Sequence, residues 1–145
     1  MLEATNVSAR YGKHVILKDF SLRLNQNESI ALIGNNGCGK TTFIKCVLGQ
    51  LKHKGVIEKV NDICIIPQND IFIDQLTVRE HFISLGTYDN NILRTFGLES
   101  SSNLFPRSLS GGQRRRLTIA LVLSLKPKIL VLDEITVGSD YLTKL

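Results

Sequence analysis

The amino-acid sequence predicts an α/β fold whose main sheet is parallel, and three observations carry that prediction. The continuous apolar runs at 29–33 and 129–132 are typical of strands that are buried on both faces. Between such runs lie segments in which apolar residues recur three or four positions apart, as on a helix. Strands that alternate with helices in this way indicate a parallel sheet. A length of 145 residues with 43% apolar residues suits one folded domain with a core.

The N-terminal part of the chain predicts strands and then a helix. Segment 2–7 is short and mixed, whereas 15–24 ends in the apolar and polar alternation of a half-buried strand. The polar run 25–28 indicates a turn before the buried strand at 29–33. In the next segment apolar residues recur three or four positions apart, which indicates one face of a helix. These residues are Phe43, Ile44, Val47, Leu48 and Leu51.

The middle of the chain carries clear start and stop signals. A short strand is expected at 62–66, ended by Pro67. Thr77 and Glu80 have the spacing of a capping box, so a helix is expected to begin there. We expect Gly86 to interrupt that helix and a second short helix to end near Gly97.

The C-terminal part predicts a buried helix and a buried strand. Ser110 and Gln113 form a second capping-box pattern, and the helix that it opens is apolar almost all round from 117 to 125. Such a helix is expected to be buried. Pro127 lies just beyond its end, and 129–132 is expected to be another buried strand.

Composition and charge narrow the classes of function. The net charge of +5 fits nucleic acid, a membrane surface or a polyphosphate ligand, but no run of five like charges occurs. The densest basic cluster, 114–116, would spread around a helix as a solvated face. The three cysteines have neither a disulfide nor a zinc spacing and fit a reducing compartment. No signal peptide is apparent, and the longest apolar stretch is far below the roughly 20 residues that cross a bilayer, so any membrane link is expected through a partner.

A glycine-rich loop lies between the strand at 29–33 and the helix after it. It matches the pattern G-x-x-x-x-G-K-[ST] in full. Glycines let the backbone wrap phosphates closely, and the helix N-terminus adds partial positive charge. Lys40 would reach the terminal phosphates and the Thr41 hydroxyl would ligate Mg²⁺. The alternative is a glycine-rich turn without a ligand. The residues of the pattern are Gly34, Asn35, Asn36, Gly37, Cys38, Gly39, Lys40 and Thr41.

Two carboxylates end the last predicted strand. Asp133 and Glu134 follow four apolar residues, and in a parallel sheet the C-terminal strand ends lie on the side of the phosphate loop. Asp133 is therefore expected to bind Mg²⁺, directly or through water. Glu134 is expected to polarise an attacking water. The alternative is a pair of ordinary surface acids.

The segment upstream of that strand carries a resemblance to a family. The pentapeptide 109–113, Leu-Ser-Gly-Gly-Gln, resembles the signature motif of ATP-binding cassette (ABC) proteins. With the phosphate loop before it and the acidic strand end after it, the resemblance covers essentially the whole chain. It implies a P-loop NTPase fold, with a RecA-like core, a small N-terminal antiparallel β subdomain and a helical signature subdomain. It also implies one partial nucleotide-binding domain over 1–145, with a helical insert at about 69–110.

The resemblance implies roles for further residues. Tyr11 would stack on adenine, Gln68 would contact Mg²⁺ and the catalytic water, and Thr42 would join the phosphate loop in binding ATP. Asp140 is similar to the aspartate of the loop after the acidic strand. In the family the signature motif contacts ATP bound to a second cassette, which implies a head-to-tail dimer. That contact would be made by Ser110, Gly111, Gly112 and Gln113.

The family also implies ATP hydrolysis that powers a transmembrane transporter, on the cytoplasmic face of a membrane, with no nucleic acid as partner. Segment 67–81 is similar to exporter cassettes, particularly the lipid-exporting A subfamily. Three features depart from the family: Ile135 replaces proline, Ser139 replaces leucine, and the segment between Lys40 and Gln68 is short, so a trimmed antiparallel subdomain is expected.

Two other readings stay open. One is a non-catalytic ATP-binding module, and the other is a soluble cassette protein that acts on ribosomes or DNA. The family continues beyond the acidic strand with a strand that carries a histidine, whereas His14, His53 and His81 all precede the signature motif. We therefore expect the domain to be incomplete at its C-terminus, and residues 1–145 alone not to sustain turnover.

Overall fold

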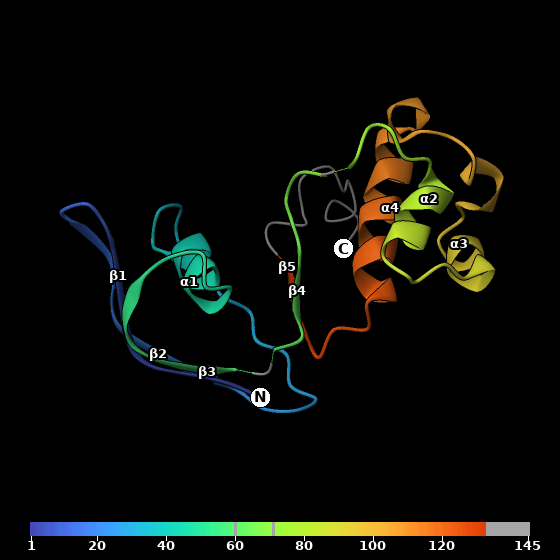
Figure 1. The fold of residues 1–145 in the computed structure, drawn as a ribbon. Coiled ribbons are helices and arrows are strands. Elements are labelled where there is room, and N and C mark those ends of the chain that lie inside the picture. The colour runs from blue at the N-terminus through green and yellow to red at the C-terminus, as the bar shows by residue number, and fades with distance from the viewer. Residues whose placement is uncertain (60, 71, 133–145) are drawn as a thin grey trace, which may run out of the picture. The chain divides into compact units, whose positions relative to one another are not determined.

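The computed structural model describes residues 1–59, 61–70 and 72–132 (Figure 1). The chain divides into two compact units, Met1–Ile63 and Cys64–Leu145. The α/β fold class is confirmed, with an antiparallel sheet in the N-terminal part and a parallel sheet.

The first unit is built on a three-stranded antiparallel sheet. Its order is β2-β1-β3, with β1 at Leu2–Tyr11, β2 at His14–Leu24 and β3 at His53–Lys59. Strand β2 agrees with the strand expected at 15–24, whereas β1 includes the segment 2–7, for which the sequence predicted no definite element. Strand β3 has no counterpart among the expected elements because its sequence is polar and contains a glycine.

Irregularities in the sheet explain the glycine of β3. The register of β1 shifts after Ala4, where Asn6 adopts a positive φ of 51°. Gly55, at φ 85°, lies against this bulge, and a Cβ there would be only 2.4 Å from the Asn6 carbonyl oxygen. Glycine is therefore the residue that lets β3 pair with β1 at this point.

Helix α1, Lys40–Val47, covers one face of this sheet (Figure 1). The helix buries Phe43 and Cys46, and the Phe43 ring meets Phe20 of β2 edge-on at a centroid distance of 4.8 Å. Burial also raises the pKa of the Cys46 thiol. The expected helix ran to Leu51, but the chain leaves the helix after Val47 because Gly49, at φ 75°, terminates it.

In the described residues of the second unit, three α-helices surround one apolar cluster. They are α2 at Val78–Ser84, α3 at Asn90–Thr95 and α4 at Gly111–Ser124, with short 3₁₀ turns η1 at Glu99–Ser101 and η2 at Pro106–Ser108. The expected helix starts after Thr77 and Ser110 are confirmed, as is the end of α3 before Gly97. The buried cluster consists of Val78, Phe82, Leu93, Leu98, Leu109, Leu117 and Ala120.

Two short strands complete the described structure. Strand β4, Ile63–Ile66, and strand β5, Ile129–Leu132, form a two-stranded sheet in agreement with the expected strands. Ile66 and Ile129 are its buried residues, and Cys64 is half-buried. Leu132 is exposed, so the run 129–132 is not covered on both faces within the described part of the chain.

Two expectations of burial were wrong. Segment 29–33 is not a strand, and Ile33 is 93% exposed. A strand needs ladder hydrogen bonds to a neighbour, and no strand in the described ranges 1–59, 61–70 and 72–132 pairs with it. The end of α4 is likewise not buried all round, because Leu123 and Leu125 are exposed while Leu117 packs in the cluster.

Candidate nucleotide-binding site

The glycine-rich loop lies at the N-terminus of α1, as expected. Gly39 is the residue that caps this helix, at φ 105°, and it is buried. A Cβ on Gly39 would lie 2.9 Å from Cδ2 of Leu17 and 3.3 Å from the Ile16 carbonyl oxygen. Strand β2 therefore packs so closely on the N-cap of α1 that only a residue without a side chain fits there.

The rest of the loop is a tight exposed turn. The Cys38 N–H donates to the Asn35 carbonyl oxygen at 3.2 Å, and Gly37 adopts φ 81°. A Cβ on Gly34 would be 2.7 Å from the Cys38 Sγ atom, so the two ends of the turn are in close approach. Residues 34–38 are exposed, which leaves the backbone of the loop accessible to a ligand.

Helix α1 differs from the other α-helices in how it begins. Among the described α-helices, it is the one that no side chain caps; like α3 and α4, it has no acidic residue in its first turn. The α2 and α4 helices begin with complete capping boxes, and the Asp89 side chain caps α3. The first N–H groups of a helix need external partners and carry partial positive charge. An anion such as a phosphate satisfies both requirements at α1.

Lys40 lies within the curve of the loop. Its ammonium donates to the carbonyl oxygens of Gly34, at 2.7 Å, and Asn35, at 3.1 Å. It is also 3.9 Å from the Cys38 Sγ atom. The adjacent Thr41 is exposed and Thr42 is buried against the unit's interior. The cation and the exposed hydroxyl are thus brought together with the bare helix N-terminus.

The predicted adenine contact, Tyr11, ends β1 and pairs with His14 across the hairpin. Its side chain is accessible, with 44% of the residue exposed. No described contact joins it to the loop. The aromatic residue is therefore placed in the same unit as the loop, and its role stays a prediction.

The signature motif, 109–113, forms the start of α4 in the second unit. Ser110 Oγ accepts from the Gln113 N–H at 3.3 Å, and Gln113 Oε1 accepts from the Ser110 N–H at 2.9 Å. The Gln113 amide also donates to the hydroxyl of buried Ser101 at 3.2 Å. Gly111 and Gly112 are exposed, so backbone and serine at this helix start are accessible.

Gln68 is exposed in the loop that follows β4, in the same unit as the signature motif. The residues on both sides of it are held by α4. The Arg115 guanidinium donates to the Pro67 carbonyl oxygen at 2.6 Å and lies 3.4 Å from Asp70 Oδ1. The Thr118 hydroxyl donates to the same Asp70 oxygen at 2.7 Å.

The sequence analysis missed Ser101, Asp70, Arg115 and Thr118. Asp70 contacts residues that lie 45 and 48 positions away, so no local spacing marks these pairs. Ser101 likewise reaches Gln113 only through the fold of the second unit.

The family model described as ABC transporter matches residues 17–137, which include both the loop and the signature motif. The chain belongs to the ABC transporter family. ABC domains of this kind bind ATP, which agrees with the loop at α1.

Relatives of this ABC chain include proteins named for import and for export. It is 28% identical to the methionine import ATP-binding protein MetN of Campylobacter jejuni, over 97% of this chain and 55% of that protein. It is 32% identical to the Nod factor export ATP-binding protein I of Sinorhizobium fredii, over 96% of this chain and 48% of that protein. The ABC chain thus spans about half the length of these curated relatives.

Solved structures support the same assignment. A structure described as the ATP binding subunit of an ABC transporter matches with a TM-score of 0.85 and 27% identity, covering 97% of this chain and 68% of that chain. Among the described residues of the ABC chain, no helix is long and apolar enough to span a membrane.

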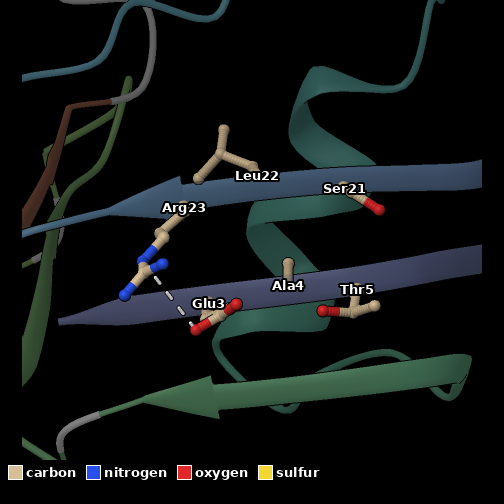
Figure 2. A pocket seen from close by; sticks show the side chains of 6 residues that line it. All are labelled: Glu3, Ala4, Thr5, Ser21, Leu22 and Arg23. Carbon is tan, nitrogen blue, oxygen red and sulfur yellow. Dashed lines mark ion pairs between the residues drawn. The ribbon is translucent and has the colours of Figure 1, made fainter.

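Asp133, Glu134 and Asp140 lie outside the described residues. Within the described ranges, no group of three His, Cys, Asp or Glu side chains is placed to hold a metal ion. A hollow on the sheet of the first unit, between β1 and β2, is lined by Glu3 and Arg23, whose side chains pair at 3.9 Å (Figure 2). The two charged side chains of this hollow pair with each other, and no residue of the ABC motifs lines it.

Proposed function

We propose that this chain binds ATP and Mg²⁺ and hydrolyses ATP to power transmembrane transport, as the nucleotide-binding domain of an ABC transporter. The observation that carries the proposal is the bare N-terminus of α1, with the Lys40 ammonium and the exposed loop 34–38 around it. Of the described α-helices, it is the one without a side-chain cap, so its first N–H groups are available to an anion.

The loop would hold the phosphates of ATP. Backbone N–H groups of the loop and of the first turn of α1 would donate to phosphate oxygens. Lys40 would exchange its bonds to two loop carbonyls for bonds to the terminal phosphates. Tyr11 would stack on adenine. The residues assigned to ATP binding are Tyr11, Gly34, Asn35, Asn36, Gly37, Cys38, Gly39, Lys40, Thr41 and Thr42.

The proposed donors for Mg²⁺ are Thr41, Gln68 and Asp133. A hydroxyl, an amide oxygen and a carboxylate are hard oxygen ligands, which suit Mg²⁺. The exposed side chains of Thr41 and Gln68 are consistent with this donor set. The bound ion would neutralise charge on the phosphates. Glu134, with Gln68 beside the water, would polarise the attacking water.

The assembly proposed is a pair of cassettes with a transmembrane partner. Ser110, Gly111, Gly112 and Gln113 would contact ATP held by the second nucleotide-binding domain. The accessible backbone at the start of α4 supports this role. The chain would then lie on the cytoplasmic face of a membrane, held there by its partner, with no nucleic acid involved. The A-subfamily type of export stays a prediction, since relatives are named for both directions.

The proposed domain organisation is a single ABC nucleotide-binding domain over 1–145, with the helical insert at about 69–110. Helices α2 and α3 fall inside the proposed insert.

The test is nucleotide affinity and turnover in two variants. Lys40→Ala removes the cation aimed at the phosphates, and a charge-assisted contact of about 1.5–3 kcal/mol corresponds to roughly 10- to 150-fold weaker binding. The control is Lys45→Ala, an exposed lysine of the same helix, with the parent's affinity expected. Equal affinity of Lys40→Ala and the parent would overturn the loop assignment.

Glu134→Gln in the assembled transporter is expected to bind ATP like the parent and to lose turnover, because the substitution keeps the size of the side chain and removes its charge. Turnover at the parent rate would contradict the role of Glu134. Binding without turnover in the parent itself would favour a non-catalytic ATP-binding module.

A further inference from the structure

The loop that carries Gln68 is fastened to α4 on both sides of the glutamine. The Arg115 guanidinium donates a hydrogen bond at 2.6 Å to the carbonyl oxygen of Pro67, the residue before Gln68. Asp70, two residues after it, accepts the Thr118 hydroxyl at 2.7 Å and lies 3.4 Å from Arg115. Gln68 and Asn69 between these anchors are exposed. The loop is therefore fixed at its ends and open at its centre.

The anchoring side chains come from one face of α4. Arg115 and Thr118 are three residues apart, so they lie side by side on the helix. The same helix begins with the boxed Ser110 and Gln113 of the signature motif. One rigid element thus carries the signature motif at its start and, within its first two turns, the anchors of the Gln68 loop.

The environment of this ion pair distinguishes it from an ordinary surface contact. The Arg115 and Asp70 side chains are only 24% and 22% exposed. The Arg94–Glu99 pair of the same unit, at a similar distance of 3.5 Å, is 73% and 61% exposed. Exposed pairs contribute little, whereas a partly buried pair that also satisfies a backbone carbonyl has more effect on local structure.

We propose that Asp70, Arg115 and Thr118 are positioning residues that fasten the Gln68 loop to α4 and so hold Gln68 in the position that its role in turnover requires. The inference rests on the proposed function for the role of Gln68 in turnover. The three side chains act through the loop and are not themselves assigned any contact with nucleotide.

The first test is hydrogen exchange in the full chain. Asp70→Ala removes the acceptor shared by Arg115 and Thr118. The peptide covering 64–70 is then expected to exchange at least about fivefold faster, with α2 and α3 unchanged, because the loop opens locally. Asp70→Asn keeps an oxygen for Thr118 and is expected to give a smaller increase. Arg94→Ala, the exposed arginine, serves as control and should leave the peptide at the parent rate.

The second test separates positioning from folding. In the assembled transporter, Asp70→Ala is expected to lower kcat roughly tenfold, a change of about 1.4 kcal/mol in barrier, while nucleotide affinity stays at the parent value. Partial restoration of kcat in Asp70→Asn is expected. A structural role alone would lower the unfolding midpoint and the yield of active protein without this split.

The outcomes distinguish the inference from the function on which it rests. Exchange of 64–70 at the parent rate in Asp70→Ala, or an equal rise in Arg94→Ala, would overturn the anchoring. Faster exchange with unchanged kcat would overturn the positioning of Gln68. A parent that binds no nucleotide would overturn the proposed function, while the exchange result would still decide whether α4 holds the loop.

Discussion

Helix α1 in the first unit has Gly39 as its N-cap residue and helix α4 in the second has Ser110, so the two helices begin by different means. The backbone of α1 turns through Gly39 in the left-handed region, with no side chain on its first N–H groups. Helix α4 closes its own first turn through Ser110 and Gln113. The first arrangement leaves the first N–H groups of the helix without a side-chain partner, whereas the second supplies such partners from within the helix. A helix start that is open to a ligand and one that is capped by its own side chains thus require different residues.

The two units also differ in how the residues near each helix start are packed. The second unit packs its helices on one apolar cluster, in which Phe82 and Leu117 are fully buried. In the first unit, the segment that leads into the phosphate loop has Ile33 in solvent. Stability in the second unit therefore depends on side-chain packing, and the conformation of the loop depends on glycine and on β2.

The largest expected effect comes from the packing of the second unit. Phe82→Ala is expected to lower the free energy of unfolding by about 3–5 kcal/mol, because it leaves a cavity among buried residues. Chemical denaturation followed by helical circular dichroism measures it. Ile33→Ala is the contrasting variant and should change stability by no more than about 0.5 kcal/mol. A large loss of unfolding free energy in Ile33→Ala would mean that 29–33 is buried and would contradict the exposure of Ile33.

A smaller effect is expected at the glycine that starts α1. Gly39→Ala forces a Cβ into the left-handed region and toward Leu17, which should lower stability by about 1–3 kcal/mol and weaken nucleotide binding. Gly37→Ala is the matched control, since its φ of 81° is also left-handed but no heavy atom lies within 4 Å of the added Cβ. It should lose only about 1 kcal/mol. Equal unfolding free energies in the two variants would contradict the contact with β2.

The smallest expected effect is a pH dependence that the capping box of α2 has and the capping box of α4 lacks. The Thr77 backbone N–H, and then the Thr77 hydroxyl, lower the pKa of Glu80 from its ordinary value of 4.5. Because the folded pKa is the lower one, this stabilisation is present above pH 4.5 and is lost as pH falls through the folded pKa. Gln113 occupies the same position in the box of α4 and does not titrate.

The measurement is amide protection at the two helix starts. Between pH 6 and pH 3, the Thr77 N–H, which donates to the Glu80 carboxylate, should lose a small part of its protection, and the Ser110 N–H, which donates to the Gln113 amide oxygen, should keep its own. Glu80→Gln should make α2 behave like α4. A parallel change at both helix starts in the parent would instead indicate general acid unfolding.

Local signals account for what could be predicted from the sequence. The two capping boxes join residues only three apart, and the glycine turn at Gly97 is a single-residue signal, so these helix ends are where the sequence places them. The glycine pattern of the phosphate loop likewise lies at a helix start. The roles assigned to its residues stay predictions.

Non-local contacts account for what could not be predicted. Strand β3 is polar and is held to β1 across about fifty residues, with Gly55 set against a bulge at Asn6. Segment 29–33 has the composition of a buried strand but, among the described residues, no paired neighbour. The anchors of the Gln68 loop, Asp70 and Arg115, meet only because the second unit folds around α4. The composition of a segment indicates which secondary structure it favours, and contacts with residues elsewhere in the chain decide whether that structure forms.

The three thiols of the protein differ in exposure, so their reaction with a thiol reagent would report which part of the chain opens. Cys38 is exposed in the phosphate loop, Cys64 is half-buried in β4, and Cys46 is a buried residue of α1 whose burial raises the pKa of its thiol. A thiol reagent would therefore modify Cys38 first and Cys46 only when α1 separates from the sheet. The order in which mass is added to the intact chain would report nucleotide protection of the loop and local opening of the first unit in one experiment, without any introduced probe.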